Sequence, residues 1–176
     1  MAHKGYAAVG LTEILAEAQV PKGSFYHFFE SKDAFGEAMM CAYFSAYLAD
    51  MDRIFADRTV SAADRLLAYL QYWSDGEALD DCAGRCLAVK LGAEVADLSE
   101  SMRAAFVEGT DGILDRLEEV VRLGAEDGSL IVHSDPRSTA EFVYDAWLGA
   151  SILTKIHRTA AALERAMALT RHLLLP

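Results

Sequence analysis

Apolar residues recur at helical spacing along most of this chain, and the first two runs are short and close together. The first run covers residues 11–18, and its apolar face comprises Leu11, Ile14, Leu15 and Ala18. Pro21 then interrupts the pattern, because proline is not tolerated inside a helix but suits its first turn. A second short helix is predicted over residues 22–29. Its phenylalanines are expected to face a core: Phe25, Phe28 and Phe29.

Longer helical patterns fill the rest of the chain. Residues 32–56 predict one long helix, whose apolar stripe is Phe35, Met39, Ala42, Tyr43, Ala46 and Tyr47. Further helices are expected over residues 62–76, from Cys82 or Gly84 to Val95, and over residues 99–127, 136–157 and 159–175. The stripe of the 99–127 helix is Met102, Phe106, Ile113, Leu117 and Val121. The chain is therefore predicted to be all-α.

Polar residues that suit helix N-caps precede several of these patterns. Ser31 and Ser99 stand directly before two long helices, and Asp135 is followed by Pro136, a favoured first helical residue. Ser61 and Asp64 form a capping-box pattern in which aspartate replaces the usual glutamate. These signals fix where four of the helices begin.

Composition narrows the class of protein. The chain has 176 residues, 53% of them hydrophobic, which favours a globular protein of one or two small cores. No apolar run approaches the ~18 residues of a membrane span, and the N-terminus lacks the apolar segment of a signal peptide. Three cysteines without an export signal favour reduced thiols in the cytoplasm. No P-loop, GxSxG or HExxH motif is present, so no enzyme, cofactor or metal site is predicted.

The two short helices predict a DNA-binding unit, because helix, tight turn and helix is the geometry that lays a second helix in a major groove. The candidate contact residues are Thr12, Lys22, Gly23, Ser24, Tyr26, His27 and Lys32. They are short or suited to phosphate oxygens. Alternatively, Thr12 is an ordinary solvent-facing residue, and Tyr26 and His27 join the aromatic core.

The net charge of −11 is unusual for a DNA-binding protein. Residues 1–35 contain three lysines against four acidic residues, so most of the negative charge belongs to the remainder of the chain. An acidic body held more than a Debye length of about 8–10 Å from DNA opposes binding only weakly.

The segment KGYAAVGLTEILAEAQVPKGSFYHFFESKDAF resembles the DNA-binding domain of the TetR family of bacterial transcriptional repressors. The resemblance implies an all-helical homodimer that binds operator DNA and a small-molecule effector in the cytoplasm. It also implies a helix-turn-helix head, which we place at residues 1–45, and an effector-binding and dimerisation body at residues 46–176. Heads of this family have a further helix before the KGY segment. Since this chain begins at Met1, we expect that helix to be missing and Leu11, Ile14, Phe25 and Phe28 to be partly uncovered.

Small residues at spacings of three and four mark the last two helices as the expected dimer interface. They allow close approach of helices in a four-helix bundle with a second copy. The expected interface residues are Ala146, Gly149, Ala150, Leu153, Ala162 and Ala166. The alternative is that these residues pack within one protomer.

Cys82, Cys86 and Lys90 follow one another at intervals of four residues, which places them on one face of a helix. A lysine one turn from a thiol favours the reactive thiolate, although Cys86 could instead be a small buried residue. The segments VPKGSFYHFF and CLAVKLGAEVADLSESMR resemble repressors that respond to N-ethylmaleimide and other electrophiles, and their acrylate-responsive relatives. That resemblance implies Cys86 as the sensor, whereas Cys41 is expected to be buried and structural.

Two alternatives stay open at this point. The first is a non-covalent sensor whose pocket is lined by Tyr69, Trp73, Leu91 and Phe106. The second, from a different class, is a ligand-binding dimer without a DNA role. Binding to promoter DNA separates the second alternative from every repressor hypothesis.

Overall fold

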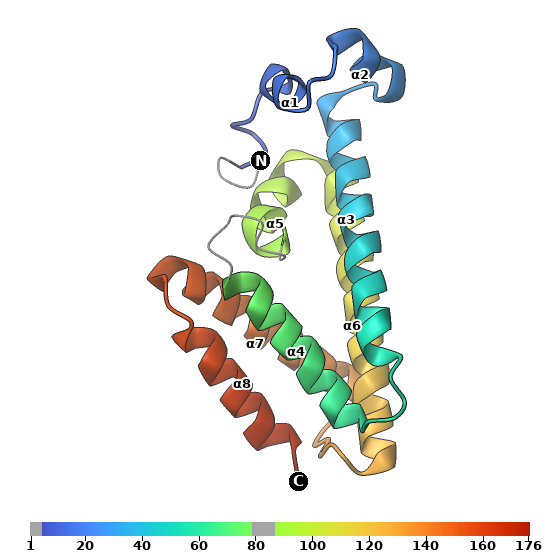
Figure 1. Cartoon of the computed structure of the whole chain (residues 1–176), viewed down its shortest axis with the longest axis vertical. Helices are drawn as coiled ribbons and strands as arrows, with labels where there is room; N and C mark the ends of the chain where they lie inside the picture. The colour runs from blue at the N-terminus through green and yellow to red at the C-terminus, as the bar shows by residue number, and fades with distance from the viewer. Residues whose placement is uncertain (1–4, 79–86) are drawn as a thin grey trace.

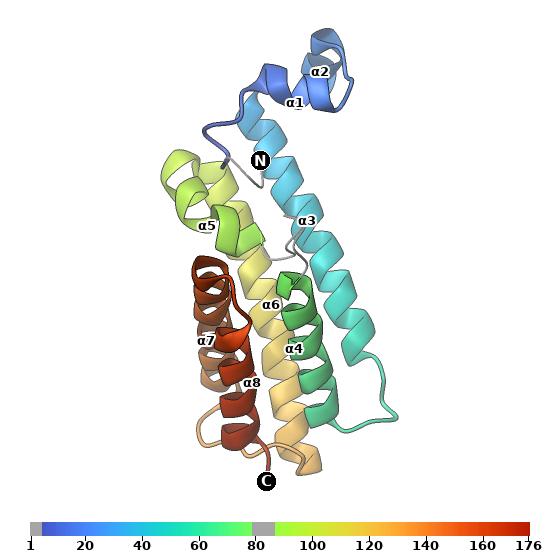
Figure 2. The same ribbon diagram turned by 60° about the vertical axis from the view of Figure 1, so that its left-hand side comes forward.

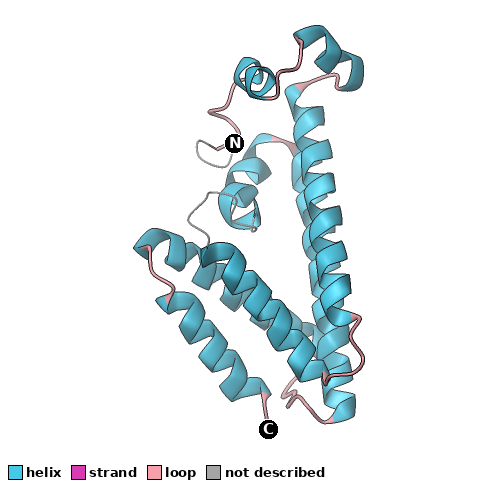
Figure 3. Ribbon diagram, viewed as in Figure 1, coloured by secondary structure: helices cyan, strands magenta, loops and turns pink. Residues whose placement is uncertain are grey.

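A computed structural model describes residues 5–78 and 87–176 of the chain. Throughout these ranges the regular structure is helical, as Figure 3 shows, so the all-α prediction is confirmed. The helices are α1 (Leu11–Glu17), α2 (Lys22–Phe28), α3 (Lys32–Phe55), α4 (Ala62–Ala78), α5 (Leu87–Leu98), α6 (Glu100–Asp127), α7 (Pro136–His157) and α8 (Ala161–Leu174). Cys82 and Gly84, where a helix was expected to begin, lie outside the described residues, and so does Cys86.

The helices form a small head on a larger body (Figure 1). The head contains α1 and α2, which stand at the N-terminal end of the long helix α3. Helix α3 runs beside α6, and α4 and α7 pack on the part of α6 that is remote from the head. Helix α8 packs on α7. Figure 2 shows α5 between the head and this bundle. The short helix α5 is therefore placed where it contacts both parts of the molecule.

The predicted helix starts are confirmed by their hydrogen bonds. The Ser31 hydroxyl accepts from the amide of Ala34, and the Ser99 hydroxyl caps α6 in the same way. The Asp135 carboxylate accepts from the amide of Ser138, with proline at the first position of α7. At α4 the Ser61 hydroxyl accepts from the amide of Asp64, which completes the first half of a capping box.

The buried stripe of α3 differs from the predicted one. The buried large residues are Met40, Phe44, Tyr47 and Met51, and of the predicted set only Tyr47 is among them. Close contact with α6 decides this register, because a Cβ atom on Gly109 would lie 2.1 Å from Phe44 Cγ. The missing side chain at Gly109 leaves room for the Phe44 ring. The stripe predicted for α6 is buried as expected.

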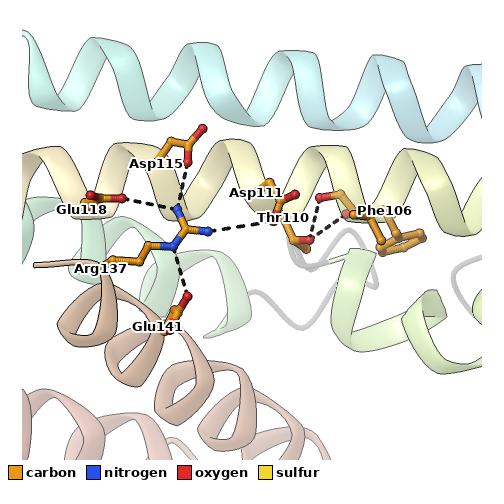
Figure 4. A network of polar contacts seen from close by, with 8 residues as sticks. Phe106, Thr110, Asp111, Asp115, Glu118, Arg137 and Glu141 are labelled. Carbon is orange, nitrogen blue, oxygen red and sulfur yellow. Dashed lines mark hydrogen bonds and ion pairs between the residues drawn. The ribbon is translucent and has the colours of Figure 1, made fainter. Parts of the chain in front are cut away.

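Arg137 joins the start of α7 to the middle of α6 (Figure 4). Its guanidinium lies 2.9 Å from Asp115, 3.5 Å from Glu118 and 4.0 Å from Asp111. Glu141, one turn later on α7, lies 3.1 Å away, and its hydrogen bond is the main reason that the pKa of Arg137 is raised. Because the acidic partners are solvent-exposed, the network, which links α7 to α6, contributes only modestly to stability.

Aromatic packing holds the head together. Phe25 is 5% exposed, and its ring lies 5.4 Å from that of Phe29 and 5.8 Å from that of Phe35. The expectation that Phe25 would be uncovered is therefore wrong. Phe28 is 76% exposed, which corrects its predicted place in the core and agrees with the expectation that it would be uncovered. The buried face of α2 follows the four-residue spacing of Phe25 and Phe29, and Phe28 lies a helical step of about 100° away from Phe29.

Candidate DNA-binding interface and effector site

The turn between α1 and α2 fixes the relative orientation of the two head helices. Gln19 has a φ of +55°, a left-handed conformation that lets the chain reverse direction after α1. The amide of Val20 then donates to the carbonyl of Leu15 at 2.9 Å, and Pro21 precedes the first residue of α2. Local sequence therefore produces the helix-turn-helix geometry that the chain pattern predicted.

The outward surface of the head contains six of the seven predicted contact residues. They are exposed in the structure: Thr12, Lys22, Gly23, Ser24, Tyr26 and His27. Lys22 Nζ lies 5.9 Å from the centre of the Tyr26 ring, so a cation and an aromatic hydroxyl are presented side by side. A Cβ atom on Gly23 would meet nothing within 4 Å, which leaves this part of α2 open to close approach. Thr12 and Lys22 line the same shallow hollow.

Lys32, the seventh candidate, has a different role. Its ammonium donates to the carbonyl oxygen of Tyr6 at 2.6 Å and lies 4.1 Å from the centre of the Tyr6 ring. Lys32 is half-buried and already paired, so we assign it to the internal structure of the head. Sequence reasoning missed Tyr6, which is 3% exposed. A single aromatic residue between Gly5 and Gly10 was the available signal.

The residues predicted for effector sensing are only partly described. Cys82 and Cys86 lie outside the described residues, as does the side chain of Lys90 in α5. Cys41 is exposed, so the prediction that it is a buried structural thiol is wrong. It lies on α3 beside Met40, whose side chain takes the buried position facing the body.

The four candidate pocket residues are all buried in one core: Tyr69, Trp73, Leu91 and Phe106. The rings of Tyr69 and Trp73 are 6.0 Å apart. The Tyr69 hydroxyl lies 2.9 Å from that of Tyr47, and Trp73 donates its indole N–H to Ser151. This core is apolar but has hydrogen-bonding groups of the kind that orient a small ligand.

The predicted dimer residues divide into two groups. Ala150 and Ala162 are each 7% exposed and belong to the protomer's own core, so their assignment to a surface is corrected. Ala166 is half-buried against the same core. Ala146, Gly149 and Leu153 are exposed on α7.

Several exposed apolar side chains near these positions were missed. They are Phe142 and Ile156 on α7, and Leu169 and Leu173 on α8. On α7 the spacing of Phe142, Ala146, Gly149, Leu153 and Ile156 by three and four residues was a readable signal for a second apolar face. We call these five residues of α7, together with Leu169 and Leu173 of α8, the α7–α8 face. Large apolar patches are uncommon on monomeric proteins and mark interaction sites, so these side chains are candidates for a protein interface.

Comparisons with known proteins agree with this architecture. The family model of bacterial regulatory proteins, tetR family, matches residues 1–39, and that of the tetracyclin repressor-like C-terminal domain matches residues 62–170. The chain belongs to the TetR family. It is a transcriptional repressor of this family, and its partners are operator DNA, a small-molecule effector and a second copy of the chain.

Individual relatives are similar over most of their length. The HTH-type transcriptional repressor NemR of Escherichia coli (strain K12) is 38% identical over 97% of this chain and 86% of its own length. The transcriptional regulator AcuR of Cereibacter sphaeroides is 33% identical over 89% of this chain and 71% of its own length. The crystal structure of the reduced form of E. coli NemR superimposes with a TM-score of 0.93, at 38% identity over 99% of this chain and 91% of that one.

These relatives are transcriptional regulators. Among the helices that the structure describes, none has the length and apolar character needed to cross a membrane.

Proposed function

We propose that this protein represses transcription by holding α2 of each protomer in a major groove of operator DNA, and that an effector releases it. The exposed surface of α2 is the observation that carries this proposal. Lys22, Ser24 and Tyr26 present donors of the kind that bind phosphates and base edges, while Phe25 fixes the opposite face of the helix in the head. The protein acts as a cytoplasmic regulator and not as an enzyme.

The DNA-binding head and the effector-binding body share helix α3. Because α3 is continuous from Lys32 to Phe55, a boundary at residue 45 lies inside one helix. We place the head at residues 1–45 and the body at residues 46–176, joined by this rigid connection. Any rotation of the body end of α3 is then transmitted to the head.

The proposed effector is a small reactive electrophile that modifies Cys86, assisted by Lys90 and accompanied by Cys82. The resemblance of the CLAVKL segment to electrophile-responsive repressors supports this proposal, as does the similarity to a NemR structure of a reduced form. Non-covalent sensing is the second candidate, and the buried aromatic core of Tyr69, Trp73 and Phe106 with Leu91 favours it.

The α7–α8 face supports dimerisation. Its apolar side chains are exposed in the single protomer, and contact with the same face of a second copy would remove them from water. A two-fold dimer also presents two copies of α2 to a palindromic operator, as repressors with this geometry require.

Gel-shift titration with DNA from the promoter beside the gene tests the proposal. Wild-type protein should shift the duplex, and Tyr26→Ala should weaken the complex without lowering the thermal stability of the body. Ala8→Ser, an exposed change in the head loop, serves as a matched control that should bind normally. A wild-type protein that binds neither this promoter nor any duplex selected from a random pool would instead be a ligand-binding dimer without a DNA role.

A further inference from the structure

The loop that leads into the head is bonded to α5 through a single carboxylate. Glu94 Oε2 accepts a hydrogen bond from the amide of Tyr6 at 3.0 Å, and Glu94 Oε1 accepts one from the amide of Ala7 at 2.8 Å. These partners are 88 and 87 residues apart in the chain. Backbone amides that donate to a charged carboxylate make stronger bonds than neutral pairs.

The backbone before Tyr6 is shaped for this contact. Gly5 has a φ of +81°, a backbone conformation that residues other than glycine rarely adopt. A Cβ atom at Gly5 would lie 2.6 Å from Glu94 Oε2, so any larger residue would displace the carboxylate. The close approach of loop and helix therefore depends on both Gly5 and Glu94.

Tyr6 carries the connection onward to the start of α3. Its hydroxyl donates to the Lys32 carbonyl at 2.8 Å and lies 2.9 Å from the Asp33 carboxylate. Burial is the main cause of a raised pKa for Tyr6, and the neighbouring Asp33 adds to it. The Tyr6 side chain also packs against Gly36, where a Cβ atom would lie 3.0 Å from the Tyr6 ring and 2.4 Å from Met102 Sδ of α6. The residues at the start of the head thus contact α3 and α5 together, at the point where α3 meets Met102 of α6.

The opposite side of α5 is anchored in the body. Leu91, three positions before Glu94, is 1% exposed, and Val95, the next residue after it, is 0% exposed. Helix α5 packs on α6 and α7 through this buried side. Because a helix moves as a unit, any displacement of Leu91 in the core also moves the Glu94 carboxylate.

We propose that Glu94 is the positioning residue that sets the orientation of the DNA-binding head on the body, by holding the amides of Tyr6 and Ala7. The inference rests on the proposed function, because the orientation matters only if the head reads operator DNA. A dimer that holds its two heads rigidly accepts one separation of the operator half-sites. When α5 moves away, the loop loses both bonds and the heads lose that fixed separation.

The sharpest test compares operators of different half-site spacing. A palindromic duplex selected by wild-type protein from a random pool is compared with versions that have one base pair added or removed at the centre. Each change moves the half-sites by about 3.4 Å and rotates them by about 35°. Wild-type protein should prefer the selected spacing on the order of tenfold.

Glu94→Gln is the main variant, because it keeps the size of the side chain but places an amide NH₂ where a carboxylate oxygen accepts. We expect its affinity for the selected duplex to fall several-fold and its preference among the three spacings to drop towards one. Hydrogen exchange at the amides of Tyr6 and Ala7 should become faster. Asp97→Asn, which removes the same charge from an exposed position on α5, controls for the altered net charge and should keep the wild-type preference.

Gly5→Ala provides an independent variant that leaves Glu94 in place but forces it away from the loop. It should flatten the spacing preference in the same way. If both variants keep the wild-type ratio among the three duplexes, whether or not their overall affinity falls, then Glu94 does not position the head. If wild-type protein selects no duplex at all, the proposed function itself fails. That outcome is distinguishable from the failure of the Glu94 inference alone, in which wild-type protein still selects a duplex.

Discussion

At the scale of single residues, Lys22 is expected to contribute a phosphate contact, beside Tyr26, to DNA binding. Both are exposed on α2, with the ammonium 5.9 Å from the centre of the Tyr26 ring. Replacing Lys22 with alanine removes one cation from the phosphate contact, so the slope of log K against log salt should become shallower by about one unit. Titrations at several salt concentrations measure this slope. An unchanged slope and affinity in Lys22→Ala would remove Lys22 from the interface.

The thiols make a second prediction at this scale. Cys86 should react with maleimide before Cys41 or Cys82, because two cations near it in the sequence, the preceding Arg85 and Lys90, favour its thiolate. The comparison is demanding because Cys41 is itself exposed and therefore open to the reagent. Brief alkylation followed by mass spectrometry gives the order, and Lys90→Met should slow the labelling of Cys86.

DNA release provides the matching functional test. Cys86→Ser should bind operator but stay bound in the presence of maleimide, whereas Cys41→Ser should still be released. First labelling at Cys41, or release of the Cys86→Ser variant by maleimide, would leave Cys86 with a structural role only.

At the scale of helices, the contact of α3 with α6 depends on one glycine. In Gly109→Ala the new methyl group would lie 2.1 Å from Phe44 Cγ, so the helices must separate or the ring must turn. Overpacking of this kind costs about 1–3 kcal/mol of unfolding free energy. Gly92→Ala is the matched control, because its Cβ atom would meet Phe106 at an ordinary 3.8 Å. Urea unfolding should show a lower midpoint for Gly109→Ala alone, and equal midpoints would contradict the assigned packing.

The junction of α4 and α6 gives a pH dependence. The Asp127 carboxylate accepts from the amides of Ala62 at 3.0 Å and Ser129 at 2.9 Å. Hydrogen bonding from Ser129 and then from Ala62 lowers the pKa of Asp127 below its ordinary 3.8. A lowered pKa means that the folded state favours the carboxylate, so this stabilisation is complete above pH 3.8 and is lost as the pH falls through the folded-state pKa. Melting temperatures measured below pH 5 should fall less steeply in Asp127→Asn than in wild type, and parallel curves would contradict the prediction.

At the scale of the whole molecule, the α7–α8 face predicts a dimer that can be broken without unfolding the protomer. Gly149 is exposed, and a Cβ atom there would meet nothing within 4 Å of the same chain. Gly149→Glu should therefore be accommodated by the single protomer but should place a buried charge in the dimer. Sedimentation should shift towards the monomer, with helical content retained.

Ala125→Glu, an exposed change on α6 outside this face, is the matched control and should stay dimeric. A Gly149→Glu protein that sediments as a stable dimer would place the interface elsewhere. Because a monomer presents one copy of α2 instead of two, operator affinity should fall together with dimerisation.

The sequence by itself determined where the described helices lie and how several begin. Ser31, Ser99 and Asp135 act through bonds to residues three positions away, so their effect is local and readable from the chain. The polar outer surface of α2 is equally local, since Pro21 and the spacing of Phe25 and Phe29 orient that helix. The family resemblance rested on the same contiguous segment.

Only the tertiary structure decided which helix face meets which neighbour. Gly109 opposite Phe44 selected the buried stripe of α3 and left Cys41 exposed. Contacts within the protomer turned Ala150 and Ala162 inward. Folding also paired Lys32 with Tyr6. It placed Glu94 on the same loop, although more than eighty positions of sequence separate Glu94 from Tyr6. These pairings depend on the steric fit of surfaces that folding brings together, and a pattern along one segment does not contain that information.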